Sequence, residues 1–188
     1  MSRDFRAVLV LGLPLWMIFS TVVFTSCKQE KTREGLSPAA VSPRLMTPEN
    51  LLDLVPPPPQ DYHVTNTILL TDTATGDSIA NASLSMQGEG GEEIYVTVSD
   101  YLKVPQFYTL ATGLWKPELS FERDGSYARE LQLPKGQVGW ESYDLSSMQG
   151  TALIGVKGRY LVSLRTEKMN PPEAARAWLL SGWIEKLP

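Results

Sequence analysis

Cysteine and histidine are the scarcest reactive residues of this chain, with one of each among 188 residues. A single cysteine excludes a disulfide within the chain and a zinc site built from several thiolates. A zinc site would have to rely on carboxylates, which is unusual for that metal. We therefore predict no metal site and no cofactor.

An excess of positive charge is also missing, because 17 lysines and arginines stand against 21 aspartates and glutamates, a formal net charge of −4. Domains that bind nucleic acid usually carry a basic patch or stripe, so we expect no nucleic-acid partner. The chain is 43% hydrophobic and 20% charged, which is the composition of an ordinary globular domain.

One long stretch near the start of the chain has no charge. It covers 18 residues from Ala7 to Phe24, follows Arg3 and Arg6, and is itself followed by small residues. A positive start, an apolar run and small residues before a cleavage site are typical of a secretory signal peptide. The run is also close to the minimum length of a spanning helix, so a single-pass membrane anchor is the alternative.

Cys27 distinguishes these two readings. The residues F-T-S-C, 24–27, resemble the lipobox of bacterial lipoproteins, although Phe24 replaces the leucine that this family prefers. The resemblance implies that residues 1–26 are a signal peptide and that Cys27 carries lipid as the first residue of the mature chain. Each buried methylene of an acyl chain contributes about 0.8 kcal/mol, so two or three chains anchor a protein firmly. Lys28 stands where an aspartate would resemble the inner-membrane retention signal, so we favour the outer membrane.

Residues 27–61 have the composition of a tether, rich in proline, serine and charge. Within it, the sequence TPENLLDL predicts a short helix near residues 48–54, with Thr47 as N-cap and Pro48 in the first turn. The prolines of Val55–Pro59 end this helix, because proline has no amide hydrogen and restricts the residue before it.

Residues 62–188 are predicted to form one domain rich in strands. Apolar residues alternate with polar ones in several runs, for example at Ile94, Val96 and Val98. Glycine-containing turns at GEGG, DG and KG separate neighbouring runs and predict hairpins. We therefore expect an antiparallel sheet of about six to seven strands.

Two helices are predicted to cover one face of this sheet. The first, Val104–Trp115, has an apolar stripe at Phe107, Leu110, Ala111 and Leu114. The second begins at Asn170 as N-cap, with Pro171 and Glu173 in a capping-box arrangement, and has its stripe at Ala177, Leu180, Ile184 and Leu187, with Trp183 beside it. This pattern predicts an α+β fold, with a β-sandwich as the alternative.

The order of these segments, including YVTVSDY, GLWKPELSFERDG, VGWESYD and GRYLVSL, resembles a group of small exported bacterial proteins of unknown function. The resemblance extends from Leu45 to Leu187. It implies one compact α+β domain and assigns no activity or catalytic residue.

Residue types that carry hydrolytic chemistry are present but poorly arranged. Ser78 lies in GDSIA, which resembles the serine motif of one esterase group, but that group places its histidine after the serine and the only histidine here is His63. Asp72 and Asp77 do not have the spacing of a calcium loop. We interpret the carboxylate pairs Glu92/Glu93, Glu122/Asp124 and Glu141/Asp144 as solvated charge at hairpin ends, and we assign no catalytic residue.

Trp178 is the residue we single out for binding, because it lies off the apolar stripe of the last predicted helix. Taken together, the sequence predicts a lipid-anchored cell-envelope protein with a non-catalytic binding or assembly role, whose partners are the membrane and an envelope protein. The alternatives are an envelope hydrolase that uses carboxylates or a serine, and a single-pass membrane-anchored exported protein.

Overall fold

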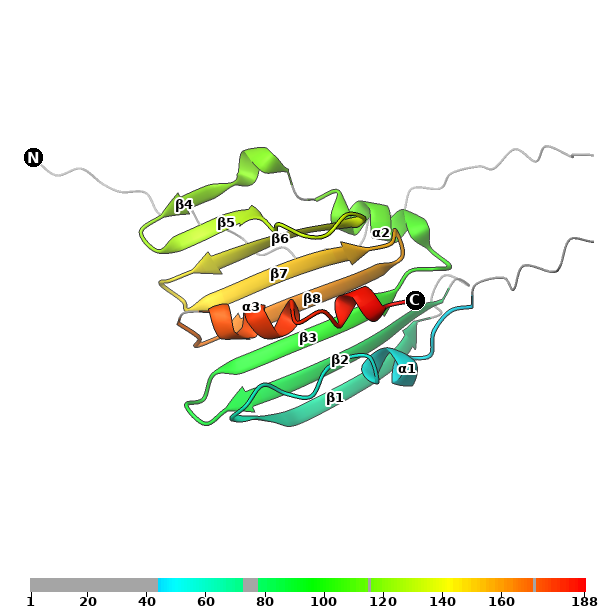
Figure 1. Ribbon diagram of the computed structural model, residues 1–188, viewed down its shortest axis with the longest axis horizontal. Helices are drawn as coiled ribbons and strands as arrows, with labels where there is room; N and C mark the ends of the chain where they lie inside the picture. The colour runs from blue at the N-terminus through cyan, green and yellow to red at the C-terminus, as the bar shows by residue number, and fades with distance from the viewer. Residues whose placement is uncertain (1–43, 73–77, 115, 171) are drawn as a thin grey trace, which may run out of the picture. The chain divides into compact units, whose positions relative to one another are not determined.

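The computed structural model describes residues 44–72, 78–114, 116–170 and 172–188, which belong to one compact unit spanning Val41–Pro188 (Figure 1). The predicted signal peptide, Cys27 and the first part of the predicted tether lie outside the described residues.

The described residues form one antiparallel sheet in the order β1-β2-β3-β8-β7-β6-β5-β4 (Figure 1). Its strands are β1 (Tyr62–Asp72), β2 (Ile79–Gly88), β3 (Glu93–Asp100), β4 (Phe121–Arg123), β5 (Ser126–Glu130), β6 (Gln137–Asp144), β7 (Gln149–Val156) and β8 (Tyr160–Glu167). The predicted antiparallel sheet is confirmed, but it has eight strands and not six to seven. The shortest strands are β4, at one edge with three residues, and its neighbour β5, with five.

Turn chemistry accounts for most of the connections. Asp124 and Gly125 join Arg123 to Ser126 with φ angles of 52° and 80°, the left-handed conformation that suits an Asp-Gly hairpin. The predicted hairpin between β2 and β3 also forms. The turn between β7 and β8 includes Arg159 as well as Lys157 and Gly158, since Val156 pairs with Tyr160.

The hydrophobic core lies on one face of the sheet. Alternate residues of the central strands are buried there, among them Ala82, Leu84, Ile94, Val96, Val98, Ile154, Val162 and Leu164. The helices α1 (Pro48–Leu52) and α3 (Glu173–Leu179) cover this face, together with the 3-10 helix η2 (Ile184–Lys186) (Figure 1). Leu51 of α1 and Leu179 of α3 are completely buried.

The domain begins earlier than predicted. Thr47 caps α1 as expected, since its Oγ1 accepts a hydrogen bond from the Asn50 amide at 3.3 Å. Because Leu51 is part of the core, residues from 44 onward belong to the folded domain. The boundary therefore differs from the one predicted between residues 61 and 62.

The helix α2 (Pro105–Thr112) lies against the opposite face of the sheet, so the prediction that both helices share one face is wrong. Gly155 of β7 stands between the core residues Ile154 and Val156 and therefore faces away from the core. A Cβ at Gly155 would lie 2.6 Å from Tyr108 Oη and 2.7 Å from Thr112 Cγ2 of α2. The core face is already covered by α1, α3 and η2, and the missing side chain at Gly155 lets α2 approach the other face closely.

The C-terminal segment forms two short helices and not the single helix predicted. Gly182, with φ of 88°, separates α3 from η2 and shifts the phase of the buried side chains. Ala177 and Leu180 are therefore exposed, whereas Ile184 and Leu187 are buried as predicted. The capping box is also wrong, because the N-cap position of α3 is Pro172 and no side chain caps it.

Among the described residues, no helix has the length and hydropathy needed to cross a membrane.

Candidate functional site

The structure separates the residues of the predicted serine-histidine chemistry. His63 lies near the start of β1, where it pairs with Gln87. Ser78 lies next to Ile79, which pairs with Asp72, the last residue of β1. Nine strand residues at about 3.3 Å each place His63 and Ser78 roughly 30 Å apart. A catalytic pair of these two residues is excluded.

Two of the predicted carboxylates are occupied by local contacts. Glu93 accepts hydrogen bonds from the Tyr95 hydroxyl and from Lys168 Nζ, which hold the pKa of Glu93 below its usual value. Asp144 accepts hydrogen bonds from the hydroxyls of Ser146 and Ser147 in the turn after β6, which likewise lower its pKa. These contacts organise a strand end and a turn.

Glu141 corrects our interpretation of the carboxylate pairs, because it is 4% exposed and not solvated. Its two oxygens accept from Arg129 Nε at 2.8 Å and contact Arg176 Nε at 3.3 Å. Arg129 belongs to β5 and Arg176 to α3, so Glu141 connects that helix to the sheet. Asp144, three residues later, points to the other face and is exposed.

No group of three or more histidine, cysteine, aspartate or glutamate side chains in the part of the chain that the structure describes could hold a metal ion.

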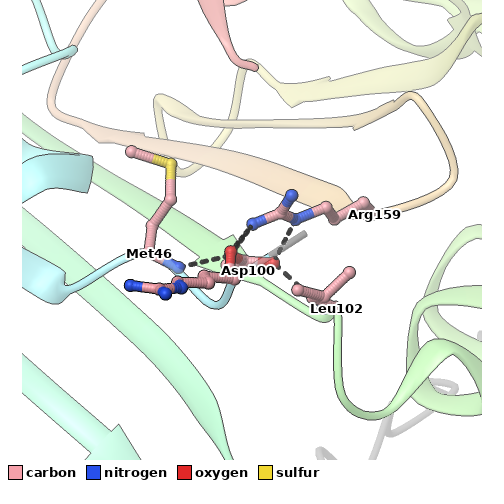
Figure 2. Close-up of polar contacts among 5 residues, drawn as sticks. Met46, Asp100, Leu102 and Arg159 are labelled. Carbon is pink, nitrogen blue, oxygen red and sulfur yellow. Dashed lines mark hydrogen bonds and ion pairs between the residues drawn. The ribbon is translucent and has the colours of Figure 1, made fainter. Parts of the chain in front are cut away.

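The most completely bonded polar cluster surrounds Asp100 at the end of β3 (Figure 2). Asp100 is fully buried, and each of its oxygens accepts two hydrogen bonds. Oδ1 accepts from Arg159 Nε at 2.7 Å and from the Leu102 amide at 2.9 Å. Oδ2 accepts from Arg159 Nη2 at 2.6 Å and from the Met46 amide at 2.9 Å.

Arg159 extends this cluster toward the beginning of the domain. Its Nη2 also donates to the Arg44 carbonyl at 2.7 Å, and its guanidinium lies 4.6 Å from the centroid of the Tyr160 ring. The hydrogen bonds to Asp100 raise the pKa of Arg159. Because both carboxylate oxygens are fully used, we assign the cluster to holding residues 44–46 against the sheet and not to catalysis.

This cluster was not predicted, although the sequence contains one signal for it. Asp100 continues the alternation of Ile94, Val96 and Val98, so it occupies a position of β3 that faces the core. A carboxylate at such a position requires a buried partner. Arg159 could not be identified as that partner, because 59 residues separate the two in sequence.

Trp178 contacts the proline-rich segment of its own chain. Its Nε1 donates to the Pro57 carbonyl at 2.9 Å, and its ring lies 6.5 Å from that of Trp183. The side chain is half-buried against the core. A role for Trp178 in binding another molecule stays a prediction, and the structure adds a role in holding Val55–Pro59 near α3.

The strongest candidate for a binding site lies beside α2, where a cleft of about 200 Å³ opens on the face of the sheet opposite the core. It is lined by Thr112, Pro117, Glu130, Val138, Gly139, Trp140, Leu153 and Gly155. Val138 is 52% exposed, so part of this lining is an apolar surface open to solvent.

The helix α2 presents its apolar stripe outward beside this cleft. Tyr108 and Thr112 face Gly155, while Phe107, Leu110 and Leu114 are 40%, 56% and 60% exposed. These are residues of the stripe that the sequence predicted to be buried. Leu119 of the 3-10 helix η1 (Pro117–Leu119) and Phe121 of β4 add further exposed apolar side chains to the same connection.

No protein-family model, curated protein or solved structure matches this chain.

Proposed function

We propose that this protein is a lipid-anchored cell-envelope protein whose α+β domain is a non-catalytic binding module. The observation that supports the binding role is the outward orientation of Phe107, Leu110 and Leu114 on α2, next to an apolar cleft. Exposed groups of large apolar side chains in soluble domains commonly mark interaction sites. The anchoring role rests on Cys27 and the apolar run before it.

The size of the cleft favours a protein partner over a small ligand. Pockets for drug-sized molecules usually have volumes of about 300–1,000 Å³. The cleft beside α2 has about 200 Å³, which suits one or two side chains inserted from a partner. We therefore propose that an envelope protein binds here through an apolar segment, with Leu110 and Leu114 forming the rim of the contact.

Intact mass spectrometry of the protein from membranes tests the anchor. The mature mass is expected to correspond to a chain that begins at Cys27 and carries acyl groups, and Cys27→Ser is expected to abolish both cleavage and acylation. A full-length mass that Cys27→Ser leaves unchanged apart from the substitution would establish the alternative, a single-pass anchor. Fractionation of the membranes then distinguishes the outer membrane, which we favour, from the inner one.

Site-specific photo-cross-linking in cells tests the binding role. A photoreactive residue at Leu110 or Leu114 is expected to yield an adduct with the same protein, and Val138→Glu is expected to abolish that adduct. A photoreactive residue at Leu145 is the control, since it is also exposed but lies in the turn after β6, at the opposite end of the sheet from α2. Equal adducts from all three positions, or none from α2, would contradict a binding site beside α2.

The hydrolase alternative lacks an assembled pair of catalytic residues among the described candidates. Ser78 and His63 lie at opposite ends of the β1–β2 hairpin, and Glu141 is bonded to two arginines.

A further inference from the structure

The strand β1 forms an unusually open edge of the sheet. It is 11 residues long and is the first strand in the sheet order, so no described strand pairs with its outer side. Every residue of β1 after Tyr62 is exposed. Three consecutive aliphatic residues are included, with Ile68, Leu69 and Leu70 at 45%, 37% and 58% exposure.

Soluble proteins usually protect such edges with charged residues, proline, a bulge or a short strand. The other edge of this sheet is protected in this way, because β4 has three residues, two of which are Glu122 and Arg123. The edge of β1 has an irregularity between Val64 and Asn66. From Asn66 to Thr71, however, the pairing with β2 is regular and no residue is charged.

We propose that β1 pairs with β1 of a second copy of this chain, in antiparallel orientation about a two-fold axis at Leu69. This arrangement continues the sheet from one copy into the other, and each copy contributes the same surface. The proposal is independent of the proposed function, because it uses neither α2 nor the lipid anchor.

The sequence of β1 is complementary to itself in this register. Leu69 lies opposite Leu69 of the second copy, and Ile68 lies opposite the second copy's Leu70. Leu69 pairs with buried Ala82 and so lies on the core side, whereas Ile68 and Leu70 lie on the opposite side. A two-fold axis perpendicular to the sheet places each face of one copy beside the same face of the second copy. Apolar residues therefore meet apolar residues on both faces.

Charge also favours a second copy in this register. Asp72, the charged residue of the regular half of β1, lies opposite Asn66 and not opposite another carboxylate. A shift of the axis to Ile68 would keep Ile68 opposite Ile68, but it would place Leu70 opposite Asn66 and Leu69 opposite Thr67, so both leucines would lose their apolar partners. Only the register centred on Leu69 pairs the three aliphatic residues with one another.

Disulfide cross-linking tests this register directly. In the full chain with Cys27→Ser, a Leu69→Cys substitution introduces the single thiol. Antiparallel pairing places the two Leu69 Cα atoms roughly 4.5–5.5 Å apart, within the usual range for a disulfide. We expect an oxidised dimer on a non-reducing gel. The control is Val138→Cys in the same background, an exposed position on β6 where no disulfide is expected, so this chain should run as a monomer on the same gel.

A second measurement covers the case in which the local geometry hinders the disulfide. Light scattering of the full-length Cys27→Ser chain in detergent is expected to show a dimer. Leu70→Lys places a charge opposite Ile68 in both halves and is expected to weaken dimerisation by about tenfold or more. Leu110→Lys, at an equally exposed position of α2, is expected to leave the dimer unchanged.

Two results would overturn the proposal. One is a chain that is monomeric by light scattering and forms no more disulfide at Leu69→Cys than at Val138→Cys. The other is a dimer that Leu110→Lys disrupts and Leu70→Lys does not, which would assign self-association to α2. Pairing of β1 with a different protein would appear as a monomer in isolation, and this also counts against a second copy.

Discussion

The carboxylate of Asp100 and the guanidinium of Arg159 form two parallel hydrogen bonds of 2.7 and 2.6 Å, in a position where Asp100 is fully buried. The pair joins the end of β3 to the turn before β8, and the Met46 amide adds the beginning of the domain to the same carboxylate. One ion pair therefore connects three segments that are distant in sequence (Figure 2).

Removal of Asp100 should be strongly destabilising. In Asp100→Ala, the mostly buried Arg159 loses its counter-ion and the amides of Met46 and Leu102 lose their acceptor. Breaking one partner of a buried pair typically costs about 3–5 kcal/mol in the free energy of unfolding. Urea denaturation of the full chain measures this change. Glu122→Ala, on the exposed strand β4, is the control and should change stability by about 0.5 kcal/mol or less.

The stability of the domain should fall in alkaline solution because of Tyr160. Burial raises the pKa of the Tyr160 hydroxyl to about 12, whereas an unfolded chain ionises tyrosine near pH 10. The part of the free energy of unfolding that depends on the protonated Tyr160 hydroxyl is fully present below about pH 10. It is lost as the pH rises toward 12, since the unfolded state releases its proton first. Urea denaturation at pH 7 and pH 11 measures this loss.

Tyr160→Phe should reduce the alkaline loss and leave stability at pH 7 nearly unchanged. Among the described residues, the Tyr160 hydroxyl has no hydrogen-bond partner, so its removal leaves no polar group unpaired. An identical decrease between pH 7 and pH 11 in both chains would show that Tyr160 is not the source.

The position of α2 should depend on the missing side chain at Gly155. In Gly155→Ala, the new Cβ would lie within 2.7 Å of Tyr108 Oη and Thr112 Cγ2, so these two side chains must shift and we expect α2 to move outward with them. Overpacking of this kind usually destabilises by about 1–3 kcal/mol. Limited proteolysis between residues 105 and 116 should become faster. Gly90→Ala is the control, because its Cβ meets only the movable carboxylate of Glu92.

The hydrogen bond from Trp178 to Pro57 should stabilise the packing of the proline-rich segment. Trp178→Phe removes this bond but keeps an aromatic ring. We expect the free energy of unfolding to fall by about 0.5–1.5 kcal/mol in addition to the effect of the smaller ring on packing. Trp183→Phe is the comparison for the loss of ring size alone, since the buried Trp183 Nε1 has no partner among the described residues. Because Trp183 is more buried than Trp178, its loss through packing is the larger of the two. Thermal unfolding measures both variants, and a Trp178→Phe chain that unfolds at the temperature of the unchanged chain would contradict a stabilising hydrogen bond.

Local pattern was enough to predict most of the sheet. The alternation at Ile94, Val96 and Val98 and the Asp124–Gly125 turn depend on neighbouring residues only, and both appear in the structure as expected. Pattern failed for the two longer helices, whose apolar stripes were assigned to the core. The helix α2 packs on the opposite face through Tyr108 and Thr112, because Gly155 has no side chain there. In the C-terminal segment, the turn at Gly182 changes which side chains point toward the core.

The sequence by itself determined the antiparallel strands, the cap of α1 by Thr47 and the expectation of a lipid anchor at Cys27, because each depends on residues close together in the chain. Only the tertiary structure decided that β3 pairs with β8, that Asp100 binds Arg159 and that α2 lies opposite the core. These are contacts between segments many residues apart. Their free energy depends on which surfaces are already buried when they meet, and no local pattern records that information.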